Sequence, residues 1–126
     1  MADHNVLGQA GELAASEYLI GKGYVVRDMN WRVGKLEIDI VAQETASNVL
    51  HVIEVKTRSD VTQFNPMESI TRAKIRNLVS AANGYVAYYE LKMAVQFDVM
   101  IIVGKAPDFE IQFIPNAFQA PLRTIR

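Results

Sequence analysis

The chain has 126 residues, half of them hydrophobic, with no cysteine and a formal charge of −1 from 13 Lys+Arg and 14 Asp+Glu. This length predicts a single domain over residues 1–126, with a C-terminal tail over residues 116–126. The lack of cysteine excludes disulfides and thiolate metal sites and favours a cytoplasmic protein. The start lacks a secretory pattern, and no apolar run reaches the ~20 residues of a membrane span. We therefore expect no membrane association.

Apolar periodicity and turn residues predict the element order αβββαββ. A helix is expected over residues 6–22, followed by strands over residues 24–29, 36–43 and 49–57. The connections between these strands are short enough for antiparallel hairpins. A polar loop over residues 59–65 precedes a second helix, which begins near Met67, after Pro66, or at Thr71 and ends at Tyr88. Strands over residues 92–103 and 109–114 complete an α/β layered fold.

Two neighbouring apolar strands carry carboxylates where a buried strand usually has none. Glu37 and Asp39 lie two residues apart in the first of them, and so do Glu54 and Lys56 in the second, so each pair shares a face. Removing a carboxylate from water is costly unless it is paired or binds a metal. The pattern predicts a site at Asp39, Glu54 and Lys56.

These residue types suit metal-dependent cleavage of a phosphodiester, in which a divalent cation neutralises the phosphate and activates water. Asp39 and Glu54 would bind Mg²⁺ or Mn²⁺, with the carbonyl of Val55 as a further ligand. Lys56, the single cation expected among these carboxylates, would orient or deprotonate the water or stabilise developing charge. The simpler interpretation is an ion pair on an edge strand, which explains most Glu-x-Lys pairs.

Several short motifs give the chain a family resemblance. They are Gly11-Glu12, Tyr18-Leu19, Gly23-Tyr24, Asn30-Trp31-Arg32, Gly34, Glu37-Ile38-Asp39-Ile40-Val41-Ala42 and Glu54-Val55-Lys56-Thr57-Arg58. With them the chain resembles the bacterial YraN-like family, which is related to archaeal Holliday-junction resolvases within the PD-(D/E)xK nuclease superfamily.

The resemblance implies a restriction-endonuclease-like αβββαβ core, with a mixed central sheet flanked by helices. It also implies that Asp39, Glu54 and Lys56 are catalytic and that Glu12 completes the metal shell. The family pattern leads us to expect arginine at position 96, where this chain has Gln96. The difference concerns a peripheral phosphate contact or structural contact and not the metal site. A resolvase-like enzyme needs two sites, so the resemblance further implies a homodimer.

Basic residues near the predicted site are candidates for nucleic-acid binding. Arg58 either grips a phosphate or simply ends its strand. Between Thr71 and Tyr89 there are three cations, Arg72, Lys74 and Arg76, and no acid. They either track phosphates or form an ordinary solvated helix face.

The remaining polar and aromatic residues in the strands favour structural roles. Glu37 is expected to support Asp39 or face solvent rather than bind metal. His51 is interpreted as a strand histidine, and Asp98 as the structural partner of a basic group. Trp31 with Arg32 could stack a base, but packing of Trp31 on the core is the favoured interpretation.

Three functions compete for this sequence. The first is a Mg²⁺- or Mn²⁺-dependent endonuclease that cuts branched or otherwise structured DNA by attack of water on phosphorus. The second is a nucleic-acid-binding module of the same fold with little or no catalysis. The third is a structural domain whose charged strand residues form ion pairs. The intact trio of Asp39, Glu54 and Lys56 favours the endonuclease, since binding alone does not require all three.

Overall fold

The predicted order αβββαββ is confirmed by the computed structural model, which describes residues 2–60 and 70–119, without the side chains of residues 2–5. The elements are α1 (Ala2–Gly21), β1 (Tyr24–Val33), β2 (Leu36–Glu44), β3 (Val49–Arg58), α2 (Arg72–Tyr88), β4 (Ala94–Val103) and β5 (Glu110–Phe118). Among these residues, neither helix is long and apolar enough to cross a membrane.

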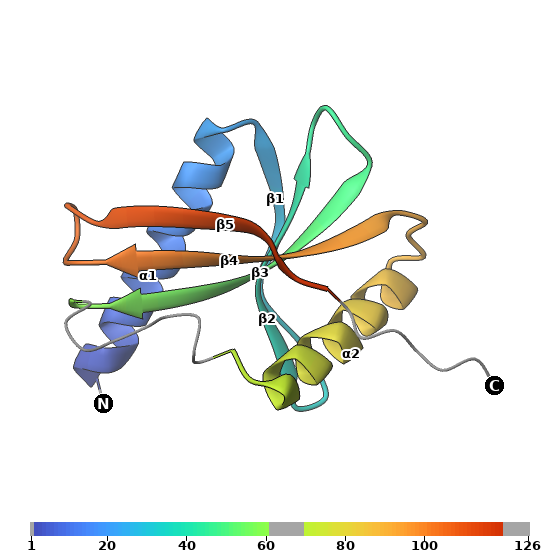
Figure 1. Cartoon of the computed structure of the whole chain (residues 1–126), viewed down its shortest axis with the longest axis horizontal. Helices are drawn as coiled ribbons and strands as arrows, with labels where there is room; N and C mark the ends of the chain where they lie inside the picture. The colour runs from blue at the N-terminus through green and yellow to red at the C-terminus, as the bar shows by residue number, and fades with distance from the viewer. Residues whose placement is uncertain (1, 61–69, 120–126) are drawn as a thin grey trace.

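All five strands form one mixed sheet in the order β1-β2-β3-β4-β5. The first three strands are antiparallel, as predicted, β4 runs parallel to β3, and β5 returns antiparallel to β4. The parallel step requires a crossover, and α2 lies within that connection. With a helix on each side of the sheet, this is the restriction-endonuclease-like α/β fold (Figure 1).

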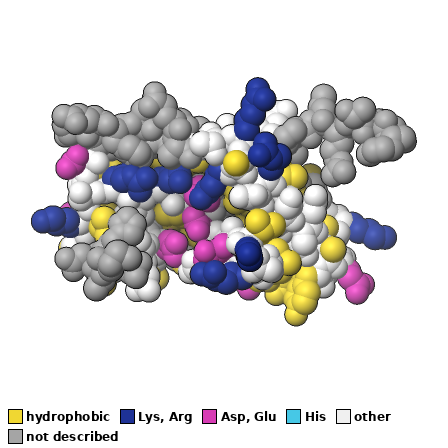
Figure 2. Space-filling view, turned by 90° about the horizontal axis from the view of Figure 1, so that it is seen from below, with side chains coloured by type: hydrophobic (Ala, Val, Ile, Leu, Met, Phe, Trp, Pro, Cys, Tyr) yellow, Lys and Arg dark blue, Asp and Glu magenta, His cyan; other side chains and the backbone are white. Residues whose placement is uncertain are grey.

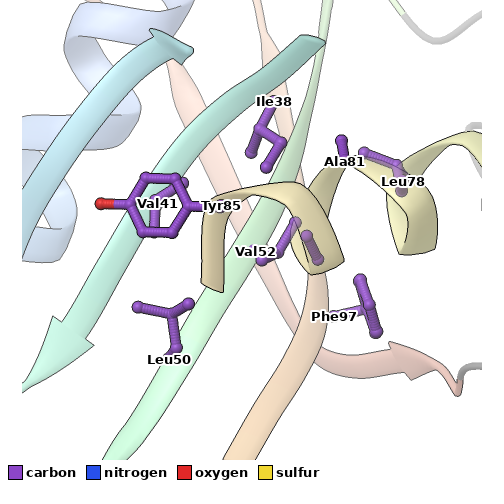
Figure 3. Packing of buried hydrophobic residues seen from close by; sticks show 9 residues of the cluster. Ile38, Val41, Leu50, Val52, Leu78, Ala81, Tyr85 and Phe97 are labelled. Carbon is purple, nitrogen blue, oxygen red and sulfur yellow. The ribbon is translucent and has the colours of Figure 1, made fainter. Parts of the chain in front are cut away.

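The hydrophobic core has two layers, one on each face of the sheet. On one face α2 contributes Leu78, Ala81 and Tyr85, which pack over Ile38 and Val52 (Figure 3). On the other face α1 contributes buried residues that pack over the opposite side of β2, β3 and β4; this layer comprises Ala15, Leu19, Ile40, Ala42, Ile53, Met100 and Ile102. The sheet is thereby buried on both sides, which explains its nearly continuous apolar strands.

The ends of several elements differ from the sequence prediction. Helix α1 begins at Ala2 rather than near Val6, and α2 begins after Thr71, whose Oγ1 accepts a hydrogen bond from Lys74 N at 3.1 Å as an N-cap. The alternative start at Met67, Pro66 and most of the predicted 59–65 loop lie outside the described residues. Strand β1 runs to Val33 rather than to Met29, passing through Asn30 with a φ of 54°.

Strand β5 extends to Phe118 rather than ending at Ile114, so residues 116–118 of the predicted tail belong to the sheet. Asn116 N donates a hydrogen bond to Asp98 Oδ1 at 2.8 Å, and Phe118 pairs with Phe97. The two rings stack with 5.4 Å between centroids. A buried side chain on β4 therefore holds the end of β5, which local sequence patterns do not reveal.

Asp98 has a structural role, as predicted, and its basic partner is His51. The His51 Nδ1 atom lies 2.6 Å from Asp98 Oδ2, and Nε2 lies 3.1 Å from Glu44 Oε1. Burial lowers the pKa of His51, but the hydrogen bonds and charges of Asp98 and Glu44 outweigh it and leave the pKa raised. Gln96 Nε2 donates to Asp98 Oδ1 at 2.9 Å, so the position that departs from the family pattern makes a structural contact.

Candidate metal and phosphodiester site

Asp39 and Glu54 lie where strands β2 and β3 stop pairing. The last pair of the β2–β3 ladder is Ile40 with Ile53, and the two carboxylates follow directly beyond it. The regular alternation of β2 is interrupted here, since Ile38 packs toward α2 whereas Ile40 packs toward α1. Asp39 Oδ2 accepts a hydrogen bond from Val55 N at 2.9 Å. A side chain thus bridges the two strands where the backbone ladder ends.

A cavity of about 210 Å³ opens at this end of the ladder, between the β1–β2 hairpin and α2. We call it the carboxylate pocket; its lining residues are Lys35, Leu36, Glu37, Asp39, Glu54, Lys74, Asn77 and Leu78. Glu37 and Asp39 do face a common space, as predicted. In the face shown in Figure 2, acidic side chains occupy the centre and Lys and Arg side chains surround them.

Glu54 is almost fully buried and is held by two lysines. Its Oε2 atom lies 3.2 Å from Lys56 Nζ and 3.0 Å from Lys74 Nζ. The expectation that Lys56 is the single cation among the carboxylates was therefore wrong. Helix α2 packs on the face of β3 that carries Glu54, and this brings Lys74 from the first turn of the helix to the site.

The charged form of Asp39 is disfavoured in this site. Burial, followed by the charge of Glu54, raises the pKa of Asp39 to about 7, against the lowering effect of the Val55 hydrogen bond. The charges of Glu12 and Glu37 contribute further to this rise. A bound cation would offset the repulsion that Asp39 experiences from these carboxylates.

Glu12 approaches the same end of the sheet from the α1 side. It lines a smaller cavity of about 150 Å³ together with Val55, Thr57 and Arg58. Burial raises the pKa of Glu12, a hydrogen bond with Asn30 opposes the rise, and the charges of Glu37 and Glu54 add to it. Asn30 is a site residue that sequence reasoning missed, although it begins the quoted Asn30-Trp31-Arg32 motif and asparagine tolerates positive φ.

The donor set fits Mg²⁺ or Mn²⁺, which take oxygen ligands and retain several waters. Asp39 and Glu54 supply carboxylates in one pocket, and their mutual repulsion is the kind that a cation relieves. Within residues 2–60 and 70–119, however, no three acidic, histidine or cysteine side chains converge as a ready metal cluster. Glu12 as a third ligand, and the carbonyl of Val55 as another, stay predictions.

The predicted nucleic-acid-binding residues do not form one surface. Lys74 turns into the carboxylate pocket, whereas Arg72 and Arg76 line a separate cavity of about 390 Å³. Residues two apart point to different sides of a helix, and residues four apart share one. Arg58 lies on the Glu12 side, where its Nη1 donates to Thr57 O at 2.8 Å.

Gly11 explains how α1 brings Glu12 close to β3. A Cβ atom at this position would lie 2.6 Å from Thr57 Cγ2, closer than real contacts allow. We expect Gly11→Ala to destabilise the fold by about 1–3 kcal/mol, because overpacking displaces the helix. Urea denaturation measures this.

Gly8→Ala is the matched control for Gly11→Ala, since a Cβ at Gly8 meets nothing within 4 Å. That change should be neutral or stabilise by up to about 1 kcal/mol through helix propensity. Combining Gly11→Ala with Thr57→Ala should restore part of the loss. If Gly11→Ala and Gly8→Ala have equal stability, the close approach of α1 to β3 is not required.

Comparison with known proteins identifies relatives that match nearly the full length of the chain. The family model described as "Uncharacterised protein family UPF0102" matches residues 11–102, which include Glu12, Asp39, Glu54 and Lys56. The chain is 44% identical over 122 residues to a UPF0102 protein of Bacteroides fragilis, covering 97% of this chain and 99% of the relative. A UPF0102 protein of Flavobacterium psychrophilum is 40% identical over 118 residues, covering 94% and 98%.

Proposed function

Because this chain belongs to the UPF0102 family, the YraN-like family that its motifs indicated, and the family's description names no reaction, we propose a function from the site. The protein is a metal-dependent endonuclease that hydrolyses phosphodiester bonds in branched or otherwise structured DNA. The observation that carries this proposal is the junction of β2 and β3, where Asp39 and Glu54 line one pocket and two lysines, Lys56 and Lys74, contact Glu54. A carboxylate in a pocket whose pKa is raised to about 7 by burial and by a specific charged neighbour supports a functional site.

Five residues in and around the carboxylate pocket have distinct tasks in this proposal. Asp39 and Glu54 hold Mg²⁺ or Mn²⁺, with Glu12 beside them. The cation, when bound, neutralises phosphate charge and makes water more acidic. Lys56, with its side chain only 12% exposed, positions the attacking water or stabilises negative charge on the phosphate oxygens. Lys74, 40% exposed, keeps Glu54 in place and can meet the DNA backbone.

A cleavage assay tests the proposal directly. Labelled branched, flapped, single-stranded and duplex DNA are incubated with the protein in Mg²⁺, in Mn²⁺ and in EDTA. We expect cutting of a branched or flapped substrate only with metal, and none by Glu54→Gln. Binding of branched DNA without any cutting would replace the nuclease by the nucleic-acid-binding module. If the protein neither binds nor cuts any of these DNAs, the charged residues form only a structural ion-pair cluster.

Arg72 and Arg76 provide a test of where DNA lies on the protein. Both are exposed on one side of α2 and can therefore contact phosphates. Each phosphate that a cation neutralises releases about 0.9 counterion from duplex DNA. We expect the Arg72→Ala/Arg76→Ala double variant to reduce the slope of log affinity against log salt by nearly two. Anisotropy titrations with branched DNA at several salt concentrations, without divalent metal, measure the slope.

The matched control removes two exposed lysines elsewhere, Lys22 after α1 and Lys105 in the β4–β5 turn. The Lys22→Ala/Lys105→Ala variant should retain the wild-type slope. A wild-type slope in the arginine variant would mean that this side of α2 is simply solvated. Equal losses in both double variants would mean that DNA binding follows total charge and not this helix.

A further inference from the structure

An aromatic groove lies at the C-terminal end of α2, next to the end of β1. Its volume is about 590 Å³, and its lining residues are Trp31, Arg32, Val33, Gly84, Ala87, Tyr88 and Tyr89. Tyr88 is 71% exposed, and the centroid of its ring lies 6.2 Å from that of Trp31 and 4.8 Å from that of Tyr89. Contiguous exposed apolar surface, unlike single exposed residues, often marks an interaction site.

Packing of the core does not account for this exposure. Trp31 does pack on the core, as predicted, with its ring edge-on to Tyr85 at 5.0 Å. Tyr85 is buried, and its hydroxyl donates to Asp28 Oδ2 at 2.7 Å and accepts from Arg27 Nε at 3.0 Å. The structural contacts of the aromatic cluster are thus made by Tyr85, whereas Tyr88 extends beyond them toward solvent.

Gly84 leaves the floor of the groove open. Glycine inside a helix costs about 1 kcal/mol relative to alanine, so packing usually has to demand it. Here a Cβ atom would meet the nearest atoms of Val33 at 3.4 Å, an ordinary contact distance. Packing therefore does not require glycine at this position, and the space that a larger side chain would fill remains available to a ligand.

The aromatic groove and the carboxylate pocket are two separate cavities bordered by the same two elements, helix α2 and the β1–β2 hairpin. Asn77 lines the pocket and Gly84 lines the groove, seven residues apart on one side of α2 and about 10 Å apart along its axis. The β1–β2 hairpin borders both, with Val33 at the groove and Lys35 at the pocket. Figure 2 shows hydrophobic side chains gathered on the same face as the central acidic side chains.

We propose that the aromatic groove stacks an unpaired nucleobase of the strand whose phosphate enters the carboxylate pocket. Flat exposed rings suit a base, since each stacked base contributes through its π-face whatever its identity. Arg32, paired with Glu37 at 3.5 Å but 69% exposed, stands beside the groove to meet the backbone. This inference rests on the proposed function and narrows its substrate to nucleic acid with unpaired bases a few nucleotides from the cleaved bond.

Trp31 is the single tryptophan of the chain, so its fluorescence reports on the groove in the unmodified protein. The test titrates the protein, in EDTA, with a short oligothymidylate, with the same oligomer made abasic, and with a duplex of equal length. We expect the oligothymidylate to quench Trp31 emission and the abasic oligomer, which has the phosphates without the bases, to leave it nearly unchanged. Equal quenching by the normal and abasic oligomers would overturn the proposal.

Two variants test the same point by affinity. Tyr88→Ala removes an exposed ring, and Gly84→Leu fills the floor; each should weaken oligothymidylate binding roughly 5- to 100-fold. Leu13→Ala, which removes a 56% exposed side chain from α1, is the control and should bind as wild type does. Thermal melts of all three variants confirm that they fold. Wild-type affinity in folded Tyr88→Ala and Gly84→Leu would overturn the proposal.

The outcomes separate this inference from the proposed nuclease. Metal-dependent cleavage without base-dependent quenching would leave the nuclease standing and overturn the stacking groove. Base-dependent quenching without cleavage of any substrate would support the groove and overturn the nuclease. If sedimentation shows a dimer and Trp31 emission changes with protein concentration alone, a second copy covers the groove and the nucleobase assignment is overturned.

Discussion

Lys56→Ala should cut DNA about 10²–10⁴-fold more slowly than the wild type while it still binds metal and DNA. This range is typical for the loss of one positioned proton-transfer or charge-stabilising group. Glu54 keeps its contact with Lys74 at 3.0 Å, so the buried carboxylate remains compensated in the variant. Single-turnover cleavage, beside titration calorimetry with Mn²⁺, measures the two effects separately.

The second lysine makes this experiment sharper than the sequence alone would allow. Lys74→Ala removes a cation from the same oxygen of Glu54, but from a more exposed side chain. If Lys56 acts on the reacting groups, Lys74→Ala should have a much smaller effect on the rate. Equal losses in both variants would assign Lys56 only to the neutralisation of Glu54. A wild-type rate in Lys56→Ala would place the observed activity outside this site.

Asp39→Asn should stabilise the metal-free protein above about pH 7. The folded-state pKa of Asp39 is raised from 3.8 to about 7, so the native protein binds the proton more tightly than the unfolded chain. Stability from this group is present below its unfolded pKa and is lost as pH rises toward about 7. At about 1.4 kcal/mol per pKa unit, the full loss is about 2–4 kcal/mol for this partly buried side chain.

Asparagine removes this loss because it stays neutral, and its amide oxygen can still accept the hydrogen bond from Val55 N. Urea denaturation in EDTA at several pH values should therefore show a gap that widens from about pH 4 to about pH 7 and then levels off. Mg²⁺ or Mn²⁺ should close much of the gap by stabilising the wild type alone. Glu37→Gln is the control in the same pocket; it keeps Asp39, whose pKa is raised mainly by burial and Glu54, so it should still lose stability as pH rises. Parallel pH profiles for wild type and Asp39→Asn would contradict the proposed role of Asp39.

Much of this arrangement follows from local patterns in the sequence. Alternation in β3 was enough to place Glu54 and Lys56 on one face, and their contact at 3.2 Å agrees with it. Asp39 was identified because burying a carboxylate in an apolar strand is costly unless the carboxylate is paired or binds a metal. The first inference depends on the period of a strand, which is fixed by the backbone itself, and the second on the apolar residues that surround Asp39 in the sequence.

The features that were not predicted depend on how elements meet. Lys74 reaches Glu54 only because α2 packs on one particular face of β3, which the period of the helix does not specify. The extension of β5 depends on the contact between Asn116 and Asp98, 18 residues apart in sequence. Likewise, the requirement for glycine at position 11 is recognised only once Thr57 is placed against it. Such long-range contacts have no local signature in one sequence.

The end of β5 also limits how the protein can assemble. An edge strand with free N–H and C=O groups invites another strand to pair with it, and proteins interrupt such edges to avoid aggregation. In β5, Pro115 has no N–H to offer, and Asn116, with a φ of 54°, turns its own N–H inward to Asp98. A continuous intermolecular sheet along this stretch is therefore blocked. Extension of the sheet at this edge cannot run past residues 115–116, and copies of the protein that meet there have to do so through side chains.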